Sequence, residues 1–243
     1  MGERPVEAVA QKLGMIYEGK AKQVYATSDP DLVIFYFKDD ATAFNAKKRG
    51  TIEKKGIVNN RMSEAFFLLL EGAGVRTHFV RRLSEREMLC RRLEIIPLET
   101  VVRNLVAGSL AKRLGRSEGE PFKQPVVEFY FKSDPLDDPM VLPAHAIAFG
   151  WAGAEEVARL ESLALKVNAV LRDFLDARGV TLVDFKLEFG RYHGEILLGD
   201  EICPDTCRLW DKATGEKLDK DRFRRDLGGV EEGYREALAR VLS

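Results

Sequence analysis

The sequence has few of the residues that build disulfide frameworks and zinc sites. Among its 243 residues are three cysteines and three histidines. A small, odd set of cysteines in a chain of this length is typical of a reducing cytoplasm, where we expect the protein to work. Cys203 and Cys207 lie four positions apart, but no second Cys/His pair with metal-ligand spacing follows. We therefore expect no zinc site, and ordinary structural roles for His78, His145 and His193.

Long hydrophobic runs and an excess of one charge are also absent. The longest apolar stretch, Ala65–Leu70, is far too short to cross a membrane, and Met1–Pro5 lacks the apolar core of a signal peptide. Lys and Arg number 38 against 39 acids, whereas nucleic-acid-binding proteins are usually strongly basic. The sequence predicts neither a membrane nor a nucleic-acid partner, and leaves room for a local basic pocket that binds a phosphorylated small molecule.

What is present is an ordinary globular composition, with 45% hydrophobic and 32% charged residues. Strand-like segments rich in β-branched and aromatic residues occur at 16–26, 32–38, 75–80 and 94–104. Apolar residues recur at three- and four-residue intervals over 154–178 and again from about Val230, which predicts two helices. A third helix is predicted from an N-cap at Asn59 or Asn60 to just before Gly72.

The order of these segments indicates the fold class. Helices and strands do not alternate in βα units, so a doubly wound parallel sheet is not expected. We predict an α+β fold in two lobes, 1–97 and 98–243, with the boundary at Pro97.

The segment Val183–Gly190 (VDFKLEFG) alternates strictly between apolar and polar residues, which predicts a strand with one buried face. Asp184, Lys186 and Glu188 then share the other face, about 7 Å apart from one to the next. If Phe189 faces Glu195 across a hairpin, Asp200 lies opposite Asp184, and Glu201 adds a further acid.

Clustered carboxylates repel one another unless a cation compensates them, and oxygen ligands beside phosphates suit Mg²⁺. The alternative is a solvated sheet face on which Lys186 balances part of the charge.

A glycine turn at Gly19 precedes two lysines, Lys20 and Lys22. With Gly14 the segment matches the spacing of a P-loop, but Ala21 stands where Ser or Thr is required, and a strand follows instead of a helix. We reject the P-loop. A turn that holds phosphates above a strand stays open, against the simpler interpretation of an exposed lysine pair.

Two further segments have the composition of anion-binding loops. Arg103 ends a strand before a small-residue turn, after which Ser109 is a candidate helix cap. The segment 199–211 is dense in Asp, Pro, Thr and Arg directly after a strand. The Arg103 segment is interpreted either as an anion site or as surface cations, and the segment 199–211 is typical of a binding loop.

Taken in order, these segments resemble the SAICAR synthetase (phosphoribosylaminoimidazole-succinocarboxamide synthase) family over nearly the whole chain. The matching motifs are YxGKAKxVY at 17–25, KGIVNN at 55–60, VVRNxxAGSL at 101–110, KSD at 132–134, DDP at 137–139, VDFKLEFG at 183–190, GDExxPD at 199–205 and RLWD at 208–211.

The resemblance implies an antiparallel-sheet nucleotide lobe and a larger α+β lobe, with ATP in the cleft between them. It assigns residues to four groups, the ATP ligands (Gly19, Lys20, Lys22, Ile95, Leu98, Glu188 and Asp200), the Mg²⁺ ligands (Glu188 and Asp200), the ribonucleotide ligands (Arg103, Ser109 and Arg208) and the reacting centre (Lys132, Asp138 and Lys186). It also favours a homo-oligomer, with a dimer as the first choice.

Two positions depart from the family pattern. Asn45 stands where many members carry Asp, and Cys207 follows Thr206 where Gly-Ser or Ser-Ser is frequent. Neither removes a required charge. Cys207 is interpreted as a small buried residue, not a ligand contact.

The reaction implied by the resemblance is ATP-driven amide formation between L-aspartate and a carboxylated aminoimidazole ribonucleotide, through an acyl phosphate. Such a site needs positioning and charge neutralisation more than an enzyme nucleophile. One alternative is a kinase that stops at phosphoryl transfer, and a second is a nucleotide sensor without turnover. Two acids beside a phosphate loop disfavour the sensor.

Overall fold

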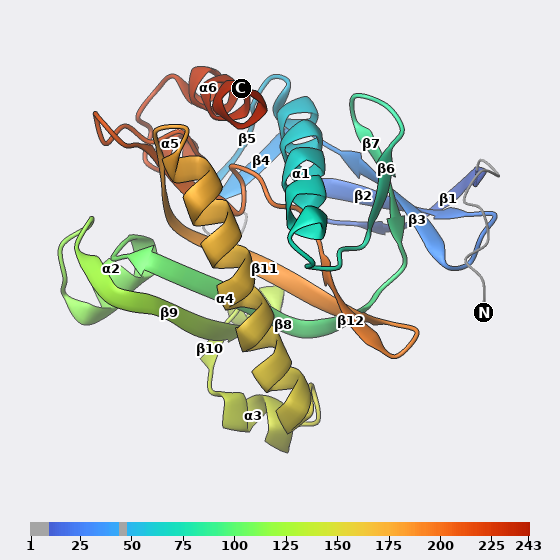
Figure 1. Cartoon of the computed structure of the whole chain (residues 1–243). Helices are drawn as coiled ribbons and strands as arrows, with labels where there is room; N and C mark the ends of the chain where they lie inside the picture. Colours follow the sequence, from blue (N-terminus) through green and yellow to red (C-terminus); the bar gives the residue numbers. More distant parts are fainter. Residues whose placement is uncertain (1–9, 44–47) are drawn as a thin grey trace.

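The structure is a computed structural model that describes residues 10–43 and 48–243, so that Asn45 lies outside the described residues. Figure 1 shows two sheets side by side, with helices α1 and α4 packed against them. Neighbouring strands are antiparallel in both sheets, which confirms the predicted α+β class in two lobes.

The first sheet is five-stranded, in the order β1-β2-β3-β7-β6. Its strands are β1 (Lys12–Glu18), β2 (Lys22–Thr27), β3 (Leu32–Phe37), β6 (Phe79–Arg82) and β7 (Glu87–Arg91). The turn predicted at Gly19 separates β1 from β2. Gly19 N–H donates to the Lys22 carbonyl at 2.8 Å, and a side chain at Gly19 would lie 3.1 Å from the Tyr17 ring.

The second sheet has the order β10-β9-β8-β11-β12, and β13 also pairs with β11. Its strands are β8 (Glu94–Leu105), β9 (Pro121–Phe131), β10 (Met140–Val141), β11 (Val180–Tyr192), β12 (Glu195–Gly199) and β13 (Cys207–Asp211). A small separate pair joins β4 (Asp40–Ala43) to β5 (Lys48–Thr51). Strand β11 pairs with β8, β12 and β13 and is the centre of this sheet.

The helices are α1 (Lys55–Gly72), α2 (Gly108–Leu114), α3 (Pro143–Ala148), α4 (Ala154–Asp176), α5 (Asp221–Arg224) and α6 (Val230–Leu242), with a 3₁₀ turn at Asp134–Leu136. The long helix and the closing helix predicted from periodicity are confirmed as α4 and α6.

The predicted start of α1 is wrong. The helix begins at Lys55, after Lys54 in the left-handed region, and Asn59 and Asn60 are buried inside it. The first turn lies close against the end of β3, since a Cβ at Gly56 would come within 2.3 Å of the Phe37 carbonyl oxygen. Tertiary packing sets this helix start, and local capping signals do not.

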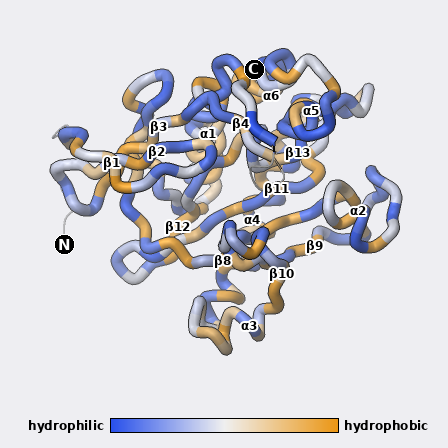
Figure 2. The backbone as a smooth tube through the Cα atoms, turned by 180° about the vertical axis from the view of Figure 1, so that it is seen from behind, coloured by the Kyte–Doolittle hydropathy of each residue, from blue (hydrophilic) through white to orange (hydrophobic). Residues whose placement is uncertain are grey.

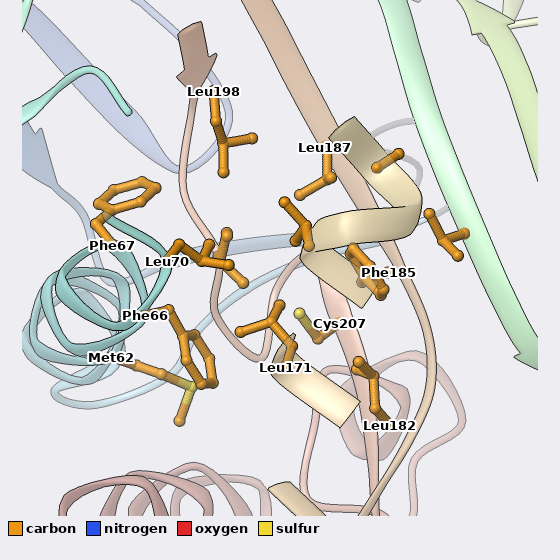
Figure 3. Packing of buried hydrophobic residues seen from close by; sticks show 14 of the residues in the cluster. Met62, Phe66, Phe67, Leu70, Leu171, Leu182, Phe185, Leu187, Leu198 and Cys207 are labelled. Carbon is orange, nitrogen blue, oxygen red and sulfur yellow. The ribbon is translucent and has the colours of Figure 1, made fainter. Parts of the chain in front are cut away.

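The core lies between the helices and the two sheets. Figure 3 shows Phe66 of α1, Leu171 of α4 and Phe185 of β11 in the same core, whereas Phe67 lies on another side of α1, where it packs against His78 and Phe79. The apolar residues of β11 therefore face the core, as the alternation predicted. Along the chain, hydrophilic and hydrophobic residues are intermixed (Figure 2), and no described helix is long and apolar enough to cross a membrane.

The two sheets touch where β12 meets the segment before β6. His78 N–H donates to the Leu198 carbonyl at 2.8 Å, and Thr77 forms a parallel bridge with Leu198. Pro97 lies inside β8, and the chain passes from one sheet to the other between Arg91 and Glu94. The division at 97/98 stays a prediction.

Candidate active site

The β11–β12 hairpin decides where its carboxylates lie. Tyr192 pairs with Glu195 across a two-residue turn, and Glu188 pairs with Gly199. The predicted pairing of Phe189 with Glu195 is therefore wrong. Asp200 directly follows the residue opposite Glu188, and it does not face Asp184.

The tight turn explains this register. His193 and Gly194 have φ values of 48° and 82°, and two consecutive left-handed residues make the short turn that suits the right-handed twist of a hairpin. The polar loop predicted at 190–194 is instead mostly strand.

Lysines and carboxylates gather around Glu188 of β11. We call Lys22, Lys132, Lys186, Glu99, Glu188, Asp200 and Glu201 the lysine–carboxylate cluster. Lys22 Nζ contacts the carboxylates of both Asp200 and Glu201. Lys132 Nζ lies 2.5 Å from Glu188 Oε1, and Lys186 Nζ lies 2.5 Å from Glu99 Oε1.

Burial and mutual repulsion set the charges in the cluster. Burial, followed by the Asp200 charge, raises the pKa of Glu188. The same two causes raise the pKa of Glu201 to about 7. Burial alone would also raise the pKa of Asp200, but the nearby charges of Lys22, Lys132 and Lys186 outweigh it and hold this pKa well below its usual range.

The donor set of Glu188 and Asp200 fits a magnesium ion. Glu188 lies inside β11 opposite Gly199, and Asp200 directly follows Gly199, while Mg²⁺ is typically held by one or two protein carboxylates with phosphate and water completing its shell. Within residues 10–43 and 48–243, no group of three or more His, Cys, Asp or Glu side chains has the geometry of a complete metal site. The two carboxylates would therefore need ligands from a bound nucleotide.

Asp184 belongs to a second group, nearer the N-terminal end of β11 than Glu188 is. We call Arg103, Arg113, Arg208, Arg224, Asp184, Asp221 and Glu128 the arginine cluster. Asp184 accepts hydrogen bonds from Arg103 Nη1 at 2.7 Å and from Arg208 Nη1 at 2.8 Å. These contacts agree with its backbone register, since Asp184 pairs with Arg103 on β8 and with Arg208 on β13.

Further bonds fix the orientation of each guanidinium. Arg103 Nε donates to Glu128 at 2.6 Å, and Arg208 Nε donates to Asp221 at 2.9 Å. Gly108 leaves room for the second arginine, because a Cβ there would lie 2.3 Å from Arg208 Nη2. Arginine held in this way keeps a planar fork ready for phosphate or carboxylate.

A pocket of about 210 Å³ opens between the two clusters. Its lining residues come from β8, β11, the loop before β13, β13 itself and α5, namely Val101, Arg103, Asp184, Phe185, Lys186, Asp205, Thr206, Cys207, Arg208 and Arg224. The pocket thus joins the arginine cluster to Lys186 of the lysine–carboxylate cluster.

The loop from Asp200 to Thr206 connects the clusters and is anchored from beneath. The fully buried Lys55 of α1 donates to Asp205 Oδ2 at 2.7 Å, and Tyr234 of α6 donates to Asp205 Oδ1 at 2.6 Å. Lys55, Ser63 and the residue between them on the same helical face, Asn59, are all buried, and Ser63 Oγ donates to the Ile202 carbonyl at 3.2 Å. The loop that carries Asp200 therefore rests on α1 and α6.

Known proteins resemble this chain in sequence and in fold. The family model described as SAICAR synthetase matches residues 15–241. The chain belongs to the SAICAR synthetase family.

Relatives and solved structures agree over nearly the full length. A phosphoribosylaminoimidazole-succinocarboxamide synthase from Chlorobium chlorochromatii is 62% identical over 95% of this chain and 98% of its own, and one from Clostridium botulinum is 56% identical over 95% and 99%. The crystal structure of the enzyme of that name from Ehrlichia chaffeensis has a TM-score of 0.92, with 48% identity over 94% of this chain and 98% of the other. A SAICAR synthetase in complex with ADP has a TM-score of 0.90, with 48% identity over 93% and 96%.

Membership of the SAICAR synthetase family confirms the resemblance found in the motifs and the enzyme class predicted from it, an ATP-dependent ligase of purine biosynthesis. The roles of individual residues stay predictions, and the structure shows where each of them lies.

Lys22, Lys132, Lys186, Glu188 and Asp200 come together in the lysine–carboxylate cluster. Arg103 and Arg208 come together around Asp184.

Other predicted residues lie at the borders of these clusters. Ser109 is exposed in the first turn of α2, 3.5 Å from Arg103 Nη2, but Ala107 and not Ser109 is the N-cap. Lys20 in the β1–β2 turn reaches Asp134 at 2.7 Å, so this turn meets the segment that carries Lys132.

Asp138 accepts a hydrogen bond from Ser133 N–H at 2.8 Å within its own loop. Ile95 is 41% exposed, whereas the Leu98 side chain is buried, so a nucleotide could contact Leu98 only through its backbone.

Several residues of the two clusters and their anchor were missed from the sequence. Lys55 and Asp205 lie in two of the family motifs, but the sequence predicts no role for them. It likewise predicts no site role for four other residues, Glu99, Glu128, Asp221 and Arg224. Lys55 and Asp205 are 150 residues apart, and no local pattern links them. Cys207 is buried, as predicted, and burial raises the pKa of its thiol to about 12. It also lines the pocket, and its having no ligand contact stays a prediction.

Proposed function

We propose that this chain joins L-aspartate to 5-amino-1-(5-phosphoribosyl)imidazole-4-carboxylate with ATP, and that the two clusters divide the work. The lysine–carboxylate cluster receives the ATP phosphates, and the arginine cluster receives the ribonucleotide's 5′-phosphate. One observation carries this proposal, which is that both clusters lie on the same face of β11, around Glu188 and Asp184.

The two ends of the site suit the two ligands. Glu188 lies four residue steps along the strand from Asp184, about 13 Å by strand rise, which leaves room for a ribonucleotide between the grip on its 5′-phosphate and its reacting 4-carboxylate. Lys186 and Arg208 both line the pocket. The β1–β2 turn, with Gly19 and Lys20, borders the same site through Asp134 and would cover the phosphates.

The reaction follows in two balanced steps. An oxygen of the substrate's 4-carboxylate attacks the γ-phosphorus of ATP, the bond to the bridging oxygen breaks, and ADP leaves. The aspartate amine then attacks the acyl phosphate carbonyl, and phosphate leaves with loss of one amine proton. Lys22, Lys132 and Lys186 hold and neutralise the phosphate oxygens, which is the main requirement of phosphoryl transfer.

Glu188 and Asp200 would hold Mg²⁺. When bound, the ion neutralises charge on the β- and γ-phosphates. The protein holds both carboxylates in place, Glu188 through its strand pairing with Gly199 and Asp200 through the anchored loop.

Two further features predicted with the family belong to this proposal. The cytoplasmic location is supported by three free, buried cysteines. A homodimer is proposed on the resemblance, and light scattering of the purified protein measures it directly.

The test is an assay of ADP release with the carboxylated ribonucleotide, in the presence and absence of L-aspartate. We expect ADP and a new amide in equal amounts only when aspartate is present. ADP release with no amide, at the same rate without aspartate, would identify a kinase instead.

A further inference from the structure

Each carboxylate proposed to hold the metal already has a cationic partner. Lys22 Nζ contacts Asp200, and Lys132 Nζ lies 2.5 Å from Glu188 Oε1. Lys22 is the more enclosed of the two lysines, with 11% of its side chain exposed against 39% for Lys132. An oxygen that accepts a hydrogen bond from an ammonium group is engaged, and the ammonium charge repels a divalent cation that approaches it.

A metal ion that takes these oxygens must therefore displace the lysines. A displaced lysine keeps its positive charge, and an enclosed charge without an anionic partner is costly. The phosphates of a nucleotide supply the anions that the two ammonium groups would lose. Lysine suits such an exchange because its ammonium is a compact charge on a flexible stem.

Glu201 gives Lys22 a second anchor for this movement. Lys22 contacts Glu201 as well as Asp200, so the ammonium can leave Asp200 and keep one carboxylate partner. Lys186 is paired with Glu99 on β8 at 2.5 Å, and Glu99 is not one of the proposed metal ligands. The exchange is thus confined to Lys22 and Lys132.

We propose that Lys22 and Lys132 block Asp200 and Glu188 against divalent cations until nucleotide phosphates take over the two ammonium groups, so that metal and nucleotide bind as a coupled pair. This inference rests on the proposed function in one respect, the assignment of Glu188 and Asp200 as metal ligands. Coupling between two ligands is reciprocal. If a lysine carries this coupling, its removal must change the metal affinity by one factor without nucleotide and by a different factor with nucleotide bound.

The experiment is a titration of the purified protein with Mn²⁺, followed by the electron paramagnetic resonance signal of the free ion, with and without ADP. For the parent we expect weak Mn²⁺ binding alone and at least about tenfold tighter binding with ADP, which corresponds to about 1.4 kcal/mol of coupling. For Lys22→Met we expect at least about tenfold tighter binding of Mn²⁺ alone than in the parent, weaker ADP binding, and a smaller effect of ADP on Mn²⁺.

Lys38→Met is the matched control. Lys38 also bridges two carboxylates of the first lobe, Glu18 at 2.9 Å and Asp40 at 2.8 Å, and it has no contact with Asp200. This change removes the same charge but leaves Mn²⁺ binding alone as weak as in the parent. Lys132→Met, at a more exposed position, repeats the test if Lys22→Met does not fold, as judged by circular dichroism.

The outcomes separate the inference from the proposed function. Equal Mn²⁺ affinity of the parent and both lysine variants without ADP would overturn the blocking role, as would a parent that binds Mn²⁺ equally well with and without ADP. Asp200→Asn tests the metal assignment itself. If it binds Mn²⁺ with ADP as tightly as the parent does, Asp200 is not a ligand and the proposed function fails at that residue.

Discussion

The two clusters on β11 solve the problem of buried charge in different ways. Around Asp184, arginines are held by several bonds each, and Arg103 alone reaches Glu128, Asp184, Ser109 and Tyr130. Around Glu188, each ammonium group pairs with one or two carboxylates, and that of Lys22 also lies 4.9 Å from the centre of the Phe35 ring. The first arrangement is a fixed grip, and the second is a set of exchangeable pairs.

The difference follows from side-chain chemistry. A guanidinium is planar and offers five donors in a fixed fork, so two carboxylates can fix it and still leave donors for a ligand. An ammonium is a point charge that can change partners without a change of geometry. A site that grips an unreacting phosphate benefits from the first arrangement, and a site where phosphates and a metal ion enter and leave benefits from the second.

The largest effect is expected where the anchor beneath both clusters is broken. Lys55→Met removes the closest cation of the buried Asp205 and leaves it only Lys220, at 3.9 Å, and loss of one partner of a buried pair typically costs about 3–5 kcal/mol. We expect a loss of this size in the free energy of unfolding by urea. The exposed neighbour Lys54 provides the control, as Lys54→Met should change stability by less than about 0.5 kcal/mol. Equal stability of the two variants would show that Asp205 needs no such anchor.

An intermediate effect separates the ligands of the two clusters. Arg103→Ala should raise KM for the ribonucleotide roughly ten- to hundredfold, about 1.5–3 kcal/mol for a lost charge-assisted contact, with a smaller change in KM for ATP. Glu128 and Asp184 retain Arg113 and Arg208 as partners, so we expect the variant to fold.

The control for Arg103 is Arg116→Ala, which removes an exposed arginine paired with Glu120. It should leave both KM values unchanged. Equal weakening of ATP and ribonucleotide by Arg103→Ala would remove the distinction between the clusters.

The smallest effect is expected at the far end of β11, outside both clusters. Arg191 there holds Glu156, with Nε 2.6 Å from Oε1, and this contact lowers the pKa of Glu156 to about 2. The pair is partly exposed, so Glu156→Gln should cost only about 0.2–1 kcal/mol and leave turnover unchanged.

The pH dependence of this pair has a definite sign. The pKa of Glu156 is lower in the folded than in the unfolded chain, so its contribution to stability is present above about pH 4.5 and is lost as the pH falls toward 2. The difference in melting temperature between the parent and Glu156→Gln should therefore shrink between pH 6 and pH 3. A constant difference would assign the effect to packing.

Patterns within one segment predicted much of this molecule. The alternation at 183–190 predicted the shared face of Asp184, Lys186 and Glu188, and periodicity predicted α4 and α6. These signals depend on residues close together in the sequence, where the periods of strand and helix apply directly.

Relations between distant segments could not be predicted in this way. The observed hairpin register places Asp200 beside Glu188, whereas the predicted register placed it opposite Asp184. The left-handed conformations of His193 and Gly194 give the two-residue turn that sets this register. Asp200, one partner of Lys22, lies 178 residues away, directly after β12. Such pairs are fixed only when the lobes pack, and the family motifs pointed to the residues without showing how they meet.

The position of the metal ion tests the division of β11 most directly. Crystals grown with ADP and Mn²⁺ would locate the ion by its anomalous scattering, independently of any activity. We predict one peak within coordination distance of Glu188 and Asp200, with the Lys22 ammonium moved from Asp200 to the phosphates. A peak beside Asp184, or none at either carboxylate of the hairpin while ADP is bound, would contradict the account.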